Sequence, residues 1–165
     1  MKKSVAMLTL AVVLLGAGAA LAGEQAWIDL ENCAMCKNLT TDMDLFQHMT
    51  WDTYLLANGM MEVTTYPAGY DERFKKLMAT FEQCGQKMAS GEQMPMCGMC
   101  SSYGQLMMSG AQMDQQQTRA GWVTVMTSQD PKVVAMIRTH GQRTIDEMAK
   151  WEAAEAAKGE HGHAH

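Results

Sequence analysis

The stretch Met94-Pro95-Met96-Cys97-Gly98-Met99-Cys100 places two thiols and three thioethers within seven consecutive residues. The same pattern occurs earlier as Cys33-Ala34-Met35-Cys36, so the chain contains C-x-M-C twice, with equivalent cysteines 64 positions apart. Two matched dithiols, each with a methionine between the cysteines, limit the chemistry to three classes. They bind a soft metal ion, exchange disulfides, or cross-link the fold.

The first 22 residues have the features of an export signal. Lys2 and Lys3 form a positive start, residues 5–18 are apolar, and residues 20–22 form a small-x-small cleavage box before Gly23. The apolar run is too short for a stable membrane span. We therefore predict an exported, most simply periplasmic, protein that is cleaved near Ala22-Gly23 and has no membrane span in its mature chain.

The expected mature chain is acidic. Loss of the two signal lysines lowers the net charge from −5 to about −7 with histidine neutral. A nucleic-acid partner needs a basic face, so this class of partner is excluded. Five cysteines in an exported chain indicate an oxidising setting and an odd thiol.

The pattern of apolar residues predicts a mixed chain. We expect an arm or short strand at 26–30, a strand at 59–66 and a second strand at 121–127. Helices are expected at 42–57, along an apolar stripe at 74–88, at 102–116, and from Pro131, where Asp130 precedes the proline as a cap.

The order of these elements repeats along the chain. Each half reads dithiol, helix, strand, helix, and both strands contain Gly-x-x-x-Val-x-Thr, beginning at Gly59 and at Gly121. We predict a helix-dominated α+β fold in which two pseudo-symmetric helix–strand–helix repeats, about 31–90 and 95–151, pair their single strands into a small sheet. The repeats form one domain over 23–158, followed by a flexible His-rich tail at 159–165.

The repeated dithiols favour a soft-metal site. Thiolates with thioethers are the ligand set of Cu(I), and Ag(I), Hg(II) or Zn(II) would compete for it. One shared four-cysteine site requires the two loops to meet. The predicted ligands are the four motif cysteines, Cys33, Cys36, Cys97 and Cys100, with Met35, Met96 and Met99 as auxiliary ligands and with His140 and His48 as further candidates.

Several of these side chains have a simpler explanation. His140 lies on an apolar helix face, where a core histidine hydrogen-bonded to backbone is the default. Cys84 lies on the apolar stripe at 74–88, where a small buried side chain is more common than a third thiolate or a resolving thiol. Of the pairs Met60-Met61 and Met107-Met108, one methionine in each is expected to face the core.

The metal hypothesis describes a chaperone or buffer, with a metal-donating or metal-receiving exported protein as partner. A homodimer is compatible with the sequence. Two alternatives stay open: thiol–disulfide exchange, and a structural or interaction module in which the dithiols are disulfide cross-links. The sequence contains no H-E-x-x-H, G-x-S-x-G or G-x-x-x-x-G-K-[ST] motif, so we expect no enzyme other than a thiol–disulfide oxidoreductase.

Overall fold

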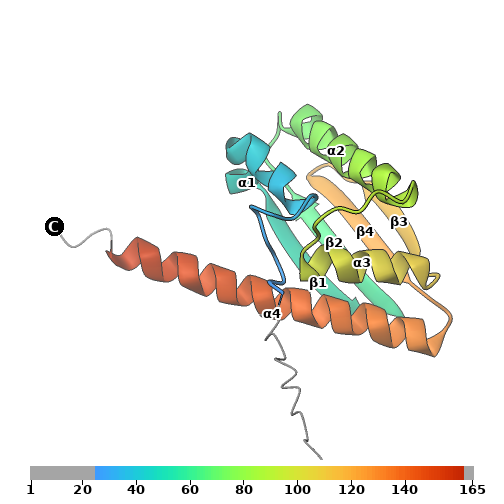
Figure 1. Cartoon of the computed structure of the whole chain (residues 1–165). Coiled ribbons are helices and arrows are strands. Elements are labelled where there is room, and N and C mark those ends of the chain that lie inside the picture. The colour runs from blue at the N-terminus through green and yellow to red at the C-terminus, as the bar shows by residue number, and fades with distance from the viewer. Residues whose placement is uncertain (1–24, 162–165) are drawn as a thin grey trace, which may run out of the picture.

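A four-stranded antiparallel sheet with helices packed on one of its faces makes up the protein (Figure 1). The computed structural model describes residues 25–161. This architecture confirms the predicted α+β class and the predominance of helix. No helix in the described range is long and apolar enough to cross a membrane.

The sheet is built from two hairpins. Strands β1 (Thr50–Leu56) and β2 (Gly59–Thr65) form the first, and β3 (Gln112–Gln117) and β4 (Gly121–Thr127) form the second. The strand order is β1-β2-β4-β3, so the two hairpins meet through the antiparallel pair β2–β4. The predicted strands at 59–66 and 121–127 are therefore the two central strands.

Two glycines allow the central strands to approach. A Cβ atom at Gly59 would lie 1.9 Å from the carbonyl oxygen of Met126, and one at Gly121 would lie 1.9 Å from that of Thr64. Gly121 also has a φ of +150°, which side chains disfavour. Gly59 pairs with Thr127 and Gly121 with Thr65, so one glycine lies at each end of the β2–β4 ladder.

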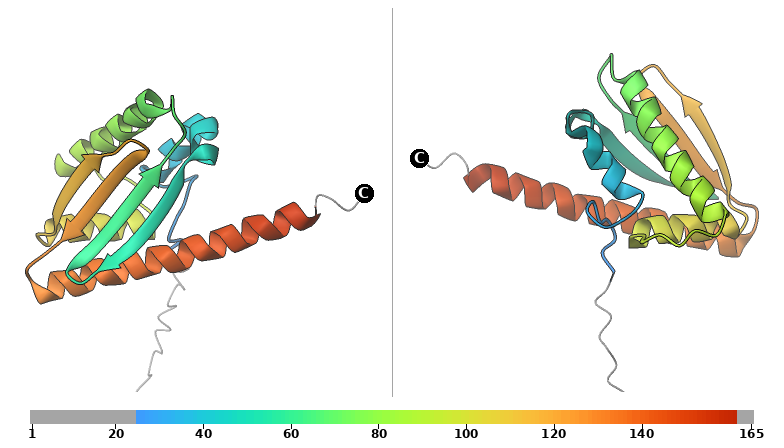
Figure 2. Two further views of the ribbon diagram at one scale, coloured as in Figure 1. Left: turned by 180° about the vertical axis from the view of Figure 1, so that it is seen from behind. Right: turned by 45° about the horizontal axis from the view of Figure 1, so that its top comes forward.

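The helices cover a single face of the sheet, as the view from behind shows (Figure 2). Their ranges are η1, a 3-10 helix, at Cys36–Asp42, α1 at Met43–His48, α2 at Asp71–Ala89, α3 at Gly98–Met108 and α4 at Pro131–His161. Helices α2 and α4 confirm the stripe at 74–88 and the helix start at Pro131. Residues 26–30 form an arm without strand pairing.

The core has two parts. Under α3 and α4, Met60 of β2 and Met126 of β4 pack with the buried side chains Leu106, Ala111, Val133 and Ile137. Under α2, Phe74 and Leu77 pack with Leu39, Leu45 and Tyr66, and the same cluster includes Cys33, Cys36 and Cys97. Three of the motif cysteines are therefore core residues.

Two helix predictions were right only over their first part, and the helix–strand–helix order is not observed. The segment predicted as helix at 42–57 contains α1 but continues as β1, because Thr50, Trp51, Thr53 and Tyr54 favour a strand and Ala57-Asn58 forms the hairpin connection. The helix expected at 102–116 ends at Met108 and is followed by β3, a polar strand held by pairing with β4. Each half thus supplies two strands.

The expected ends of the chain fall partly outside the described residues. The export signal at 1–22 lies outside them. Helix α4 continues to His161, so it includes the first residues of the segment expected as a tail at 159–165, and the rest of that segment lies beyond the described part.

The central glycines give the first prediction. Gly59→Ala or Gly121→Ala must push β2 and β4 apart, because the new Cβ collides with backbone, and we expect a loss of about 3 kcal/mol or more in the free energy of unfolding. Gly85→Ala in α2, where the added Cβ meets nothing within 4 Å, is the control. It should stabilise the protein by up to about 1 kcal/mol. Urea unfolding measures all three, and near-wild-type stability of the first two variants would contradict the strand geometry.

Candidate metal centre

The two C-x-M-C loops meet at one point in the structure. The sulfur atoms of Cys33, Cys36, Cys97 and Cys100 all lie within 4.8 Å of one another. Cys36 is the central member, with its Sγ 3.4 Å from that of Cys100 and 3.6 Å from that of Cys97. The four thiols therefore form one group rather than two separate dithiols.

Backbone hydrogen bonds hold the loops together. The amide of Ala34, inside the first motif, donates to the carbonyl of Pro95, just before the second, at 2.8 Å. The N-terminal arm adds a second clamp, because the carbonyls of Ala26 and Trp27 accept from the amides of Gly98 and Met99, both at 2.9 Å. These two amides begin α3 and would otherwise lack partners.

Each loop leads into a helical turn. Cys36 is the first residue of η1, and Cys97 is the N-cap of α3, with Cys100 in its first turn. The carbonyl of Cys33 accepts from the amide of Lys37, and the carbonyl of Cys97 accepts in the same way from the amide of Ser101.

The glycine of the second motif has a steric role. A Cβ at Gly98 would lie 3.0 Å from Cε3 of Trp27 and 3.4 Å from the carbonyl oxygen of Ala26. The indole of Trp27 is buried, donates from Nε1 to Thr144 Oγ1 and stacks under the guanidinium of Arg143. Glycine at position 98 therefore lets the arm lie flat against the loop, with Trp27 anchored on α4.

The thiols of the group differ in pKa. Hydrogen bonding from Cys100, aided by Cys97 and Cys33, lowers the pKa of Cys36 to about 6 although burial opposes this shift. The pKa of Cys100 is raised, chiefly because it donates to Cys36, and burial raises the pKa of Cys97 to about 11. The group thus carries negative charge first on Cys36, where three other thiols stabilise it.

The spacing suits a single thiophilic ion. Four thiolates at about 2.3 Å from a tetrahedral ion are about 3.8 Å from one another. The separations between Cys36 and its two neighbours, 3.4 and 3.6 Å, are close to this value, and the largest separation in the group is at most 4.8 Å. These separations are therefore compatible with four sulfurs that share one metal ion.

The predicted auxiliary methionines lie close to this part of the core. Met35, Met96 and Met99 are partly buried and pack against the apolar cluster that includes Cys33, Cys36 and Cys97. They add polarisable thioether side chains to the apolar cluster in which these cysteines lie.

The two predicted histidines are placed elsewhere. His140 is buried on α4, its Nδ1 lies 3.0 Å from Ser102 Oγ, and its ring contacts that of Trp27. His48 is exposed at the end of α1, with Nδ1 2.7 Å from the carbonyl oxygen of Asp44. Neither belongs to the four-cysteine group.

Cys84 is also outside the group. It lies half-buried on α2, and its thiol donates to the carbonyl of Ala34 at 3.6 Å, so it contacts the backbone of the first loop rather than the four sulfurs. All five cysteines are free thiols, so the disulfide cross-links of the structural alternative are absent from residues 25–161.

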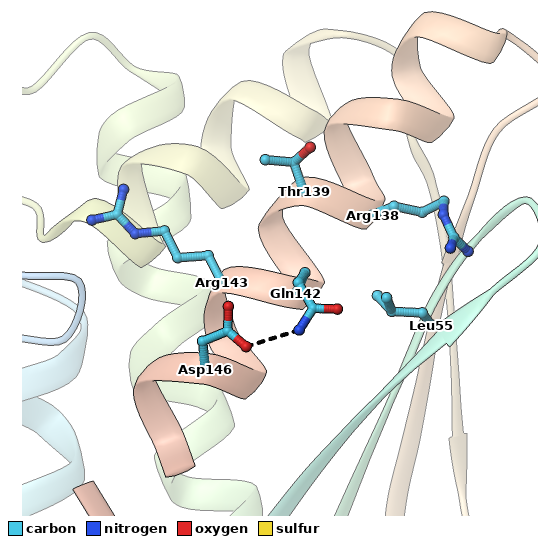
Figure 3. A pocket seen from close by; sticks show the side chains of 6 residues that line it. All are labelled: Leu55, Arg138, Thr139, Gln142, Arg143 and Asp146. Carbon is cyan, nitrogen blue, oxygen red and sulfur yellow. Dashed lines mark hydrogen bonds between the residues drawn. The ribbon is translucent and has the colours of Figure 1, made fainter. Parts of the chain in front are cut away.

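A surface hollow between α4 and β1 offers no competing site. It is lined by Leu55, Arg138, Thr139, Gln142, Arg143 and Asp146. Figure 3 shows that the guanidinium groups of Arg138 and Arg143 point in opposite directions, so they do not converge on a common anion. Gln142 and Asp146 are hydrogen-bonded to each other at 2.8 Å.

Comparisons of the chain with models of known protein families, with curated proteins and with solved structures find no match. The class of protein therefore rests on the site itself. Its geometry defines a group of four free cysteines that can hold a metal ion.

Sequence reasoning missed three supporting residues. Trp27 packs against Gly98 of the second loop. The carbonyl of Pro95 accepts the hydrogen bond that joins the loops, and the hydroxyl of Ser102 is hydrogen-bonded to His140. The one sequence signal for a close neighbour is Gly98 in C-G-M-C, since the first motif has alanine at the equivalent position.

His140 gives a prediction about acid stability. Burial lowers its pKa to about 4, below the unfolded value of about 6.5, so the unfolded chain binds a proton that the folded chain excludes. This contribution to stability is complete above about pH 6.5 and falls as the pH drops towards 4, by roughly 3 kcal/mol in all. Urea unfolding of the reduced apoprotein across this range should give a shallower pH slope for His140→Gln than for wild type. Equal slopes would contradict the burial of a neutral imidazole.

Proposed function

We propose that this chain is an exported soft-metal-binding protein, with Cu(I) as its preferred cargo, that acts as a metal chaperone or buffer. One observation carries the proposal: four free thiols from two distant C-x-M-C loops lie within 4.8 Å of one another. Thiolate is the ligand that selects soft cations, and Ag(I), Hg(II) or Zn(II) would compete.

The unequal burial of the four cysteines supports both the retention of a metal ion and its transfer to a partner. Cys33, Cys36 and Cys97 are buried, whereas Cys100 is only half-buried. A Cu(I) ion is satisfied by fewer thiolates than the four that a closed structural Zn(II) site uses. Three buried sulfurs can therefore hold the ion while Cys100 yields its place to a thiolate of a partner protein.

The setting of the protein is part of the proposal. The chain is released outside the cytoplasm after cleavage near Ala22-Gly23 and exchanges metal with an exported donor or acceptor. Its acidic character, with a formal charge of −5 before cleavage, favours cations over nucleic acid. We assign it no enzymatic activity.

We also propose that its two halves arose from one repeated unit. The equivalent hydrogen bonds from Lys37 and Ser101 within the loops support this, as do Gly59 and Gly121 at opposite ends of the β2–β4 ladder. Two related units that face each other would bring their dithiols to a shared centre.

Thiol–disulfide exchange is the second candidate, favoured by the low pKa of Cys36, about 6. This thiol is 2% exposed, so a protein disulfide can reach the group only through Cys100. Catalysed reduction of a disulfide substrate by the metal-free protein would support this candidate over metal binding.

An anaerobic Cu(I) titration of the reduced mature protein against a competing chelator tests the proposal. We expect one tightly bound Cu(I) per chain and protection of the four clustered thiols from alkylation, because all four lie at one centre. The doubly substituted Cys33→Ser, Cys97→Ser protein should bind at least 100-fold more weakly.

Cys84→Ser is the matched control for this titration, because Cys84 is a thiol of the same fold outside the group. It should bind Cu(I) as wild type does. Equal uptake by wild type and the doubly substituted protein would exclude the centre. Cys100→Ser changes the least buried of the four cysteines and therefore disturbs the fold least. Weaker Cu(I) binding by this variant would not be a result of misfolding.

A further inference from the structure

Methionine dominates the exposed apolar surface of the described residues. The large apolar side chains that are exposed there are Tyr54 and the methionines Met43, Met107, Met108, Met113 and Met136. Leucine, isoleucine, phenylalanine and tryptophan are absent from this set. Methionine is the one strictly apolar side chain that also offers a metal donor, its thioether sulfur.

Three of these methionines lie where α3 turns back into β3. We expected one of Met107 and Met108 to face the core, but Met107 is 40% exposed and Met108 is 82% exposed. The chain reverses at Gly110, where φ is +86°, and the amide of Ala111 donates to the carbonyl of Leu106. Strand β3 therefore begins beside the end of α3.

Met113 is directed towards α3 by a hydrogen bond. The Tyr103 hydroxyl donates to Met113 Sδ at 2.7 Å, and Met107 lies one helical turn after Tyr103 on the same side of α3. Met107 and Met113 therefore both lie beside Tyr103, Met107 on the same helix and Met113 on β3.

Met113 is also the exposed end of a row of thioethers across the sheet. It pairs with Met126 of β4, and Met126 pairs with Met60 of β2, so the three side chains lie on one face of adjacent strands. Met60 and Met126 are fully buried, whereas Met113 is 41% exposed. A cation that reaches Met113 thus finds a further sulfur, that of Met126, on the neighbouring strand.

We propose a second soft-metal site, built only from thioethers, at Met107 and Met113 with Met108 at its outer edge and Met126 beneath. The ions that this site binds are the monovalent soft cations Cu(I) and Ag(I). Uncharged thioethers release no proton on binding and cannot form disulfides, and they offer little to Zn(II), which prefers thiolate, imidazole and carboxylate. The site is independent of the four-cysteine centre, because Met60 and Met126 belong to the other part of the core.

Ag(I) titration of the protein with ¹³C-labelled methionine methyl groups tests this site. The reduced mature chain is titrated in chloride-free buffer, and thiolate absorption in the ultraviolet shows when the four-cysteine centre is filled. We expect the methyl signals of Met107 and Met113 to move next, at about one further equivalent of Ag(I), because both residues lie beside Tyr103 at the proposed site. The signals of Met43 and Met136, on α1 and α4, should stay in place.

Leucine variants complete the test, since leucine keeps the volume and removes the sulfur. Met107→Leu with Met113→Leu should lower the affinity for the additional Ag(I) at least tenfold, whereas Met43→Leu, 46% exposed in wild type, should leave it unchanged. Motionless methyl signals at Met107 and Met113, or equal movement at Met43, would overturn the proposal. Thiolate absorption and methyl shifts are separate readouts, so failure of the four-cysteine centre is distinguishable from failure of the thioether site.

Discussion

The structure depends on the contact between its two C-x-M-C loops. The hydrogen bond from the Ala34 amide to the Pro95 carbonyl, 2.8 Å long, joins segments that are otherwise far apart in the chain. Cys33, Cys36 and Cys97 belong to the same buried cluster as the apolar side chains under α2. The same side chains therefore belong both to the core and to the four-cysteine group that can hold a metal ion, so metal binding at this group would be coupled to folding.

The arm at 26–30 extends this coupling towards α4. Its carbonyls cap the start of α3, and Trp27 then contacts His140 and Thr144 on α4. A change in the second loop must therefore be accommodated by α3 and α4 together. This rigidity favours a preformed centre, whereas the partial exposure of Cys100 gives the centre a single accessible edge.

The sequence predicted the central features and missed the peripheral ones. The repeated motif identified the four cysteines, and Gly-x-x-x-Val-x-Thr identified β2 and β4, because both signals lie within a few residues. The helical spacing of Met43, Phe46, Met49 and Thr53 extends the predicted helix beyond α1 into β1. Strand β3 has a polar sequence that forms a strand only through its pairing with β4. The meeting of the loops is a long-range contact, which the repeat allowed but no local pattern specified.

The central claim is that both loops bind one ion at one centre. X-ray absorption of the anaerobic Cu(I)-loaded mature protein, with metal and protein counted in the same sample, tests it most directly. The predicted result is one tightly bound copper per chain, surrounded only by sulfur. Two coppers per chain, each bound by one dithiol, or nitrogen and oxygen in the first coordination sphere, would contradict it.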